Sequence, residues 1–284
     1  MTARIIHSIA ELRAALAEVR RAGASIGLVP TMGALHAGHR SLIERSVRET
    51  GCTVVSVFVN PIQFNDAGDY KSYPRTLDDD ARLCGDAGAA IVFAPSGEEM
   101  YPQPQRAFVE VESLTEGLCG AFRPGHFRGV ATVVLKLFNI VQPDVAYFGQ
   151  KDAQQLAVLR RMVADLNVPL RLAGVPIVRE ADGLAMSSRN RHLSREERRV
   201  APSVYQALLH AQARIAGGVS DPAQVRAEAA SELERQGLRV EYFEIVDPDS
   251  MQRMDRIAGP VLAATAVWLG STRLIDNIVC APVS

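Results

Sequence analysis

The sequence lacks the features that mark several large classes of protein. No apolar run approaches the roughly 18 residues that a membrane span needs. Residues Met1 to Glu11 carry charges and no apolar segment ending at a small-residue cleavage site, so no signal peptide is predicted. The 31 lysines and arginines nearly balance the 32 aspartates and glutamates, which gives a formal net charge of −1 and a pI near 6.6. Since binding of tRNA or DNA leaves a basic footprint, we expect neither a nucleic-acid nor a membrane partner.

The chain also has few cysteines and no covalent-catalysis motif. Its four cysteines, at positions 52, 84, 119 and 280, form no C-x-x-C pair. A disulfide framework or a zinc site is therefore not indicated, and a reducing, cytoplasmic location is the expectation. No internal repeat and no G-x-S-x-G nucleophile elbow is present. A Ser-His-Asp arrangement built from distant residues is left open by the sequence.

What is present is an ordinary globular composition with a clear alternation of strands and helices. The chain has 284 residues, 48% of them hydrophobic, and at this length folding buries roughly three quarters of the chain's surface. Apolar or β-branched runs predict strands at 26–29, 53–59, 91–94 and 145–148. Amphipathic patterns predict helices between them, beginning at Ser8, Ser41, Thr76, Val130 and Ala153. This order predicts an α/β class, Rossmann-like, doubly wound parallel sheet with ligands at the carboxyl ends of its strands.

The pattern changes after residue 178. A capping box at Ser194 opens charged helices over 196–215 and 223–236, and strands follow at 239–246 and 263–269. We therefore expect a main domain over residues 1–178 and a smaller C-terminal α+β domain over residues 179–284. Trp268, which alternates with polar neighbours, is interpreted as a core residue.

The segment from Val29 to Ser41 is the strongest functional signal. It is a turn containing Gly33 and Gly38 between a strand and a helix. A helix start offers unpaired backbone N–H groups and about half a positive charge, which suits a polyphosphate. His36 and His39 would stand at that helix start, where imidazole nitrogens can donate hydrogen bonds to phosphate oxygens.

Three further loops carry polar groups that suit an anionic substrate. Gln63 follows the second strand, and its amide can hold a small hydroxy acid without charge. Lys151, at the turn after the fourth strand, can meet phosphate oxygens, and Asp152 can cap the next helix or reach a ribose hydroxyl. In Met186-Ser187-Ser188-Arg189, hydroxyls and a guanidinium can stabilise a departing pyrophosphate.

Two segments allow competing interpretations. Asp78, Asp79 and Asp80 lie in the first turn of a helix, where carboxylates complement the helix dipole. One of them could instead contribute to an Mg²⁺ site, but the sequence names no ligand, and the metal site stays unknown. Arg123 and His126 lie in a glycine- and proline-containing stretch that could be a flap over an anionic substrate or a solvated turn.

The segment Pro30-Thr31-Met32-Gly33-Ala34-Leu35-His36-Ala37-Gly38-His39 resembles the H-x-G-H signature of the nucleotidyltransferase and class I aminoacyl-tRNA synthetase superfamily. In full it resembles the pantothenate synthetase (pantoate:β-alanine ligase) family. Asn60-Pro61-Ile62-Gln63-Phe64, the Arg123 to Gly129 segment and Met-Ser-Ser-Arg also resemble family motifs, the last in the position of a K-M-S-K-S loop. The family often has glutamate where Gln150 stands, which puts a charge-based role for that position in doubt.

The resemblance implies ATP and Mg²⁺ as co-substrate and cofactor, pantoate and β-alanine as substrates, and a homodimer. It implies catalytic roles for His36, His39 and Lys151, with His39 either a proton donor or only a stabiliser of phosphate charge. The implied ATP contacts are Met32, Gly33, Ala34, Leu35, His36, Ala37, Gly38, His39, Gly149, Gln150, Lys151, Asp152, Val178, Met186, Ser187, Ser188 and Arg189. The implied substrate contacts are Gln63, Gln155, Thr31 and Met32.

The reaction implied is attack of the pantoate carboxylate on ATP to give pantoyl adenylate and pyrophosphate, followed by attack of the β-alanine amine. Three other interpretations share part of the signature. An adenylyltransferase acting on the phosphate of another cofactor precursor would need extra cationic residues for that phosphate in place of Gln63 and Gln155. A tRNA synthetase fragment is disfavoured by the charge balance, and a nucleotide-sensing module would bind ATP without releasing pyrophosphate.

Overall fold

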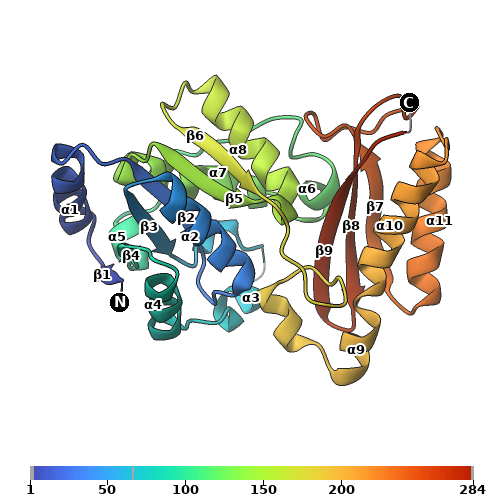
Figure 1. Cartoon of the computed structure of the whole chain (residues 1–284), viewed down its shortest axis with the longest axis horizontal. Coiled ribbons are helices and arrows are strands. Elements are labelled where there is room, and N and C mark those ends of the chain that lie inside the picture. Colours follow the sequence, from blue (N-terminus) through green and yellow to red (C-terminus); the bar gives the residue numbers. More distant parts are fainter. Residues whose placement is uncertain (1–2, 66, 283–284) are drawn as a thin grey trace. The chain divides into compact units, whose positions relative to one another are not determined.

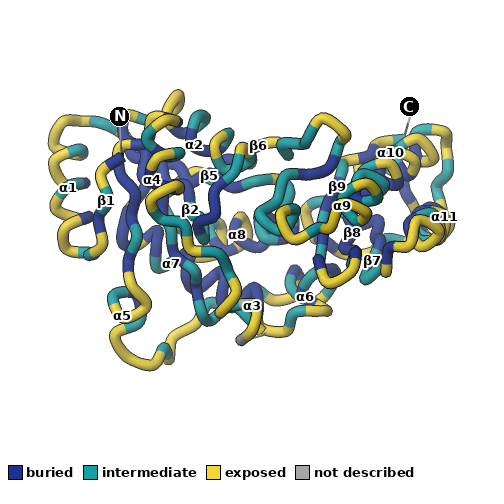
Figure 2. The backbone as a smooth tube through the Cα atoms, turned by 90° about the horizontal axis from the view of Figure 1, so that it is seen from below, coloured by how far each residue is buried: buried dark blue, intermediate teal, exposed yellow. Residues whose placement is uncertain are grey.

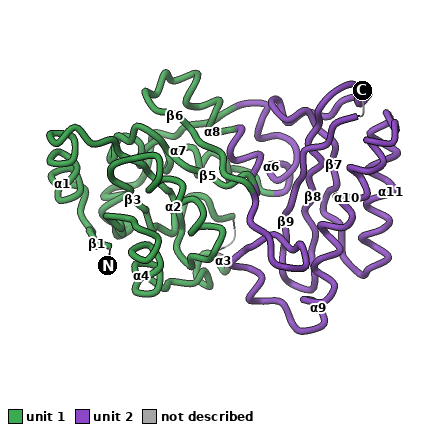
Figure 3. Tube along the Cα trace, viewed as in Figure 1, with its two compact units in different colours: residues 1–111, 123–150, 158–176 green, residues 112–122, 151–157, 177–284 purple. Residues whose placement is uncertain are grey.

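The structure is a computed structural model that describes residues 3–65 and 67–282. Asp66, part of the polar loop expected after Gln63, lies outside the described residues. The chain divides into two compact units (Figure 3). Unit 1 comprises residues 1–111, 123–150 and 158–176, and unit 2 comprises residues 112–122, 151–157 and 177–284. Where the functional domains divide, with residue 178 as the expected boundary, stays a prediction.

Unit 1 is built on one parallel sheet of six strands, so the predicted α/β class is confirmed (Figure 1). The strand order is β1-β4-β3-β2-β5-β6, and every neighbouring pair is parallel. The strands are β1 (Arg4–Ile6), β2 (Ile26–Thr31), β3 (Cys52–Val57), β4 (Ile91–Phe93), β5 (Val145–Gly149) and β6 (Arg171–Val175). The chain order reverses between β2 and β5, the kind of position where such sheets bind ligands.

Helices cover both faces of this sheet. The helices of unit 1 are α1 (Ile9–Arg21), α2 (Ala37–Glu49), α3 (Ala67–Ser72), α4 (Leu77–Asp86), α5 (Gly97–Met100), α7 (His126–Val141) and the end of α8 (Ala153–Asp165). Helix α2 packs on β2, β3 and β5, whereas α7 packs on β2 and α1. Gly27 permits the close approach of α2, because a Cβ there would lie 2.1 Å from Ser46 Oγ.

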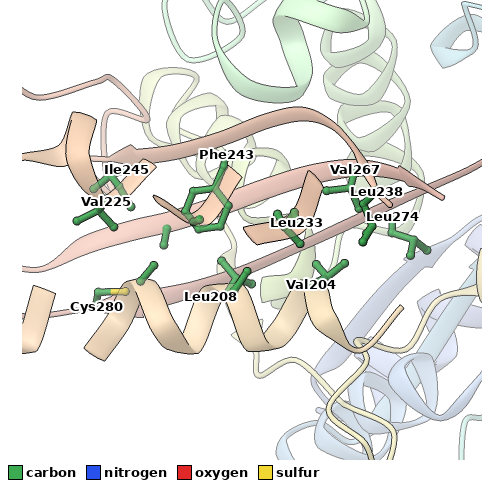
Figure 4. Packing of buried hydrophobic residues seen from close by; sticks show 14 of the residues in the cluster. Val204, Leu208, Val225, Leu233, Leu238, Phe243, Ile245, Val267, Leu274 and Cys280 are labelled. Atoms are coloured by element: carbon green, nitrogen blue, oxygen red, sulfur yellow. The ribbon is translucent and has the colours of Figure 1, made fainter. Parts of the chain in front are cut away.

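Unit 2 contains an antiparallel sheet of order β7-β8-β9 with helices packed against it. Its elements are α6 (Leu118–Phe122), α9 (Arg195–Val200), α10 (Ser203–Ala216), α11 (Pro222–Arg235), β7 (Arg239–Val246), β8 (Val261–Leu269) and β9 (Thr272–Cys280). Val204 and Leu208 of α10 point toward the strands that carry Phe243, Val267 and Leu274 (Figure 4). In the described part of the chain, the sheet strands are largely buried and the outer helix surfaces exposed (Figure 2).

Several expected elements have different limits in the structure. The helix expected over 196–215 is two helices, α9 and α10, with Pro202 between them because proline cannot donate the backbone hydrogen bond that would continue the first. Helix α7 begins at His126 instead of Val130, so part of the expected loop is helical. Strands β1, β6 and β9 were not predicted.

The capping predictions and the core assignment of Trp268 had mixed outcomes. Ser8 and Ser194 cap their helices, and the box at Ser194 is complete with Glu197. Thr76 precedes α4 but makes no side-chain cap. Trp268 is only half-buried, and its indole nitrogen donates to Glu241 at 2.9 Å. Within the described residues, no helix is both long and apolar enough to cross a membrane.

Candidate functional site

The signature loop leaves β2 at the point where the sheet order reverses. Thr31 ends β2 and its hydroxyl donates to Ser56 O at 2.7 Å while accepting the Gly33 N–H at 3.2 Å. Gly33 and Ala34 have φ of +85° and +51°, and this left-handed turn carries the chain into α2. A left-handed conformation costs little at glycine but is unfavourable for Ala34, which has a Cβ. The turn therefore depends on contacts from the rest of the fold.

Those contacts come from Asp80 on α4. Its carboxylate accepts the Ala34 N–H at 3.0 Å and the Leu35 N–H at 2.7 Å, and it also accepts the Thr76 hydroxyl at 3.2 Å. The residue is only 2% exposed. Asp80 is therefore directed into the protein, in contrast to the dipole role expected for this cluster. Thr76, expected as a cap, donates to Asp80 instead.

The two signature histidines use the same ring nitrogen in the same way. His36 Nδ1 accepts the Gly38 N–H at 3.1 Å, and His39 Nδ1 accepts the His36 N–H at 3.3 Å. A nitrogen that accepts a hydrogen bond carries no proton, so in the neutral ring the proton is on Nε2. Both imidazoles thus hold an Nε2–H donor, with ring centroids 4.2 Å apart.

This arrangement corrects one premise of the sequence interpretation. The Gly38 N–H, in the first turn of α2, is not unpaired, because the His36 side chain caps it. The histidines replace part of the backbone as the hydrogen-bonding groups at the helix start.

Gln63 lies in a network that fixes which way its amide points. The Gly129 carbonyl can only accept, so the amino group of Asn60 must face it at 3.2 Å, and the same group donates to Gln63 Oε1 at 3.0 Å. The Tyr101 hydroxyl donates to Asn60 Oδ1 at 2.8 Å. Burial raises the pKa of Tyr101, so it stays a donor.

The other end of the Gln63 amide has a weak partner. Its Nε2 lies 3.0 Å from Met32 Sδ. A thioether sulfur is a poor acceptor, so this amino group keeps capacity to donate to a stronger acceptor. Gln63 and Met32 lie side by side, as the substrate assignment for both residues requires.

His126 and Arg123 lie beside the Gln63 backbone. His126 Nδ1 donates to Gln63 O at 2.9 Å, and its Nε2 lies 3.3 Å from an Arg123 nitrogen. His126 is in the first turn of α7 and 8% exposed, so it is not part of a solvated turn. A cavity of about 170 Å³ beside them is lined by Ile62, Gln63, Phe64, Asn65, Phe108, Pro124, Gly125, His126, Arg128 and Gly129.

The turn after β5 begins in unit 1 and continues in unit 2. Gly149 ends β5, which pairs with β2, and Gln150 opens a short 3-10 turn through Asp152. Lys151 belongs to unit 2, where its carbonyl accepts the Asn277 amide at 2.9 Å. This bond attaches the lysine turn to β9.

The Met-Ser-Ser-Arg loop follows a small hairpin in unit 2. The Met186 N–H donates to Val178 O at 3.0 Å, and Ser187 caps the 3-10 helix 188–192 by accepting the Arg189 N–H at 3.2 Å. Arg179 lies at the base of the hairpin, where its guanidinium carbon is 3.6 Å from the centroid of the Tyr205 ring. Its guanidinium also donates to the Asp276 carboxylate at 2.6 Å. The loop that carries Ser187 and Ser188 is therefore held by ordered neighbours on both sides.

The paired glutamines at the start of α8 differ in environment. Gln154 is buried, accepts the Cys119 N–H at 3.0 Å, and donates to the carbonyls of Leu114 and Gly117. It is a structural residue. Gln155 is partly exposed, as a substrate contact must be.

The described residues offer no cluster of three or more histidine, cysteine, aspartate or glutamate side chains able to hold a metal ion. Of the acidic triad considered for Mg²⁺, Asp80 is directed at the loop and Asp79 pairs with Arg82 at 3.3 Å.

Unit 1 brings together the segment from Thr31 to His39, Gln63, and the end of β5 at Gly149 and Gln150. Unit 2 holds Lys151, Asp152, Gln155, Val178 and residues 186–189.

Sequence reasoning missed Asn60, Tyr101 and the role of Asp80. For Asp80 a signal was present, because it shares helical spacing with Leu77, Ala81 and Cys84 on the apolar face of α4. An acidic residue on a buried face indicates a fixed hydrogen-bond partner. Asn60 and Tyr101 are far apart in the chain, and no local pattern links them.

The parallel sheet, with a histidine-bearing helix start where its order reverses, places the chain in the class of Rossmann-like α/β enzymes. A family model described as pantoate-beta-alanine ligase matches residues 4–279. The chain belongs to the pantoate-β-alanine ligase family and is thus an enzyme, a ligase of pantothenate biosynthesis.

Relatives and solved structures agree with this assignment. Pantothenate synthetase from Heliobacterium modesticaldum is 54% identical over 97% of this chain and 99% of the relative, and pantothenate synthetase 1 from Bradyrhizobium diazoefficiens is 54% identical over 97% and 98%. A crystal structure of pantothenate synthetase from Thermus thermophilus matches with a TM-score of 0.89, 47% identity and coverage of 97% and 98%. The pantoate-beta-alanine ligase of Francisella tularensis, complexed with beta-gamma ATP and beta-alanine, matches with a TM-score of 0.83, 31% identity and coverage of 98% and 97%.

Proposed function

We propose that this chain condenses pantoate with β-alanine in two steps at one site. In the first, a pantoate carboxylate oxygen attacks the α-phosphorus of ATP, and the bond to pyrophosphate breaks. In the second, the β-alanine amine attacks the carbonyl of pantoyl adenylate, AMP leaves, and the amine loses a proton to give the amide of pantothenate. Positioning and charge stabilisation carry the reaction, and no side chain bonds to substrate.

The hydrogen bonding of the histidine pair carries this proposal. Because backbone N–H groups engage both Nδ1 atoms, His36 and His39 offer Nε2–H donors suited to phosphate oxygens. Met32, Gly33, Ala34, Leu35, Ala37 and Gly38 shape the backbone around the phosphates. His39 stabilises charge on the α-phosphate in the transition state, and proton donation is the alternative role.

The remaining ATP contacts come from the later loops. Lys151 contacts the pyrophosphate as a point charge. Ser187, Ser188 and Arg189 stabilise the negative charge of the departing pyrophosphate. Gly149, Gln150 and Asp152 line the nucleotide at the end of β5, and Val178 lies against adenine. The support is the family motif in each loop and the ordered neighbours of the lysine turn and the serine loop.

Pantoate is held by neutral amides. Asn60 donates to Oε1 of Gln63, so the amino group of Gln63 is the end presented to the substrate. On binding, this amino group exchanges its weak partner, the Met32 sulfur, for a pantoate oxygen. Gln155, Thr31 and Met32 complete the substrate contacts.

Magnesium enters this reaction as Mg-ATP. Mg²⁺ commonly keeps waters and substrate phosphates as ligands and takes few carboxylates, which agrees with the lack of an acidic cage among the described residues. The protein's contribution is to bind the phosphates that carry the ion.

We also propose a cytoplasmic homodimer with domains at residues 1–178 and 179–284. The four free cysteines suit a reducing compartment. Sedimentation analysis should give twice the 30.8 kDa chain mass.

An exchange assay tests the function. The purified chain with Mg²⁺, ATP and labelled pyrophosphate should exchange label only when pantoate is present, and adding β-alanine should release AMP and pantothenate. Exchange driven by another cofactor precursor would indicate an adenylyltransferase instead. Binding of ATP with no exchange under any condition would leave a nucleotide-sensing module.

A further inference from the structure

The carboxylate of Asp80 holds the backbone of the signature loop at Ala34 and Leu35, and Asp80 itself is not among the residues assigned to substrate. We propose that Asp80 is a positioning residue for the adenylation step, because it holds the loop backbone that orients both signature histidines. The proposal rests on the proposed function of that loop.

The contacts of Asp80 are those of a fixed anchor. It is 2% exposed, and a buried carboxylate is expensive unless hydrogen bonds surround it. It has them: Oδ2 accepts from Ala34 and Thr76, and Oδ1 accepts from Leu35. Hydrogen bonds to an ionised acceptor are stronger than neutral ones, so the loop gains two strong attachments at successive residues.

The loop needs this attachment because of its backbone. Ala34 has a φ of +51°, which its Cβ disfavours, and the Asp80 carboxylate accepts the backbone N–H of this residue. The fit around the carboxylate is close, since a Cβ built on Gly33 would lie 3.0 Å from Asp80 Oδ2. Without the carboxylate, the turn would relax toward ordinary backbone conformations.

The effect would reach the chemistry through the backbone N–H groups. His36 directly follows the anchored Leu35, and the His36 N–H is the group that orients His39 through its Nδ1. A shift of the turn therefore moves one imidazole and removes the partner that orients the other. Misplacement of a catalytic group by about 1 Å can cost about a hundredfold in rate. The second step, attack by β-alanine, depends less on phosphate charge.

Asp80→Asn tests this, because asparagine keeps the shape but offers one oxygen acceptor in place of two. We expect pantoate-dependent ATP–pyrophosphate exchange to slow at least about tenfold. AMP release from preformed pantoyl adenylate with β-alanine should change less than about twofold, and the Mg²⁺ dependence should stay unchanged. Asp79→Asn is the matched control, since Asp79 lies on the same helix turn with a side chain 72% exposed, and it should leave both steps intact.

A second readout needs no substrate. Hydrogen exchange at one of the Ala34 and Leu35 amides should be at least about tenfold faster in Asp80→Asn than in Asp79→Asn, because the amide that faces the new side-chain NH2 group loses its acceptor. If wild-type protein lacks pantoate-dependent exchange, the proposed function fails, and protected amides would still support the anchor. If Asp80→Asn does not fold, Thr76→Val, which removes one donor, should show the same selective slowing to a smaller degree.

Three results would overturn the proposal. Equal slowing of both steps would mean a general structural role, a raised Mg²⁺ requirement would mean a metal ligand, and unchanged amide exchange would mean that the loop does not depend on Asp80.

Discussion

At the scale of single residues, the two signature histidines act as a unit because one orients the other. His36 caps the helix start, and its backbone N–H holds His39 by Nδ1. This geometry favours a neutral Nε2–H donor over a group that releases a proton, since a neutral imidazole is a weak acid.

The choice between these roles for His39 can be tested with two substitutions. His39→Ala should slow adenylation about a hundredfold or more, the usual cost of losing a transition-state donor. His39→Gln, whose amide keeps an N–H donor, should recover a large part of that loss in ATP–pyrophosphate exchange. A glutamine variant as slow as the alanine variant would assign proton transfer to His39. His210→Ala, an exposed histidine paired with Glu232, serves as the control.

Gln63 and its supporting network should control the affinity for pantoate. Gln63→Ala should raise the pantoate KM about tenfold or more, as expected for losing a hydrogen bond to a charged group, with the KM for ATP unchanged. Tyr101→Phe, which releases Asn60, should shift the pantoate KM in the same direction but less. Steady-state kinetics with each substrate varied would measure both. Equal changes for pantoate and ATP, or an effect as large for the exposed Gln103→Ala, would contradict the assignment.

At the scale of elements, α2 is fixed at both ends. Asp80 and the histidines order its start, and Glu49 ties its end to the sheet through Tyr147 of β5 and Arg171 of β6. Arg45, and then Arg171, hold the pKa of Glu49 at about 2, below the 4.5 usual for a free glutamate. A lowered pKa means that the contribution to stability is complete above about 4.5 and is lost as the pH falls toward about 2.

A comparison of melting temperatures against pH tests this link. Glu49→Gln should melt below the wild type at pH 7, and the difference should shrink as the pH falls from about 4.5 toward about 2. Glu44→Gln is the control, because Glu44 pairs with the exposed Arg40 and exposed pairs contribute little. A difference that stays constant with pH would show that the Glu49 charge is not responsible.

At the scale of the whole molecule, each unit has its own hydrophobic core. The core cluster of unit 2 runs from Leu184 to Cys280 and lies within residues 179–284. Two earlier segments also belong to this unit, held in part by the Gln154 hydrogen bonds and by Phe122 stacked on Tyr242. Residues 179–284 therefore have a core cluster of their own, and residues 112–122 and 151–157 cover part of it.

A fragment of residues 179–284 should fold by itself. Because the core is intact, we expect cooperative thermal unfolding by circular dichroism, at a lower temperature than in the full chain because Tyr242 loses its cover. The fragment should show no ATP–pyrophosphate exchange, because it lacks both signature histidines. A broad, non-cooperative melt would mean that residues 112–122 and 151–157 are required for folding.

The sequence by itself determined the fold class and the family, and it supplied most of the residues proposed for the candidate site. Strand and helix periods are local, and so are the motifs around His36, Gln63, Lys151 and Ser188, so each can be recognised within a few consecutive residues. The same local rules misplaced boundaries where one residue overrides a pattern, as Pro202 does between α9 and α10.

Only the tertiary structure decided which side chains support the site. Three hydrogen bonds join residues that are far apart in the chain. They link Leu35 to Asp80, Tyr101 to Asn60, and Asn277 to Lys151. The sequence placed Asp80 in a helix turn where its charge could suit the dipole or a metal. A hydrogen bond depends on distance and direction between two groups, and folding alone fixes these when the partners are not neighbours in the chain.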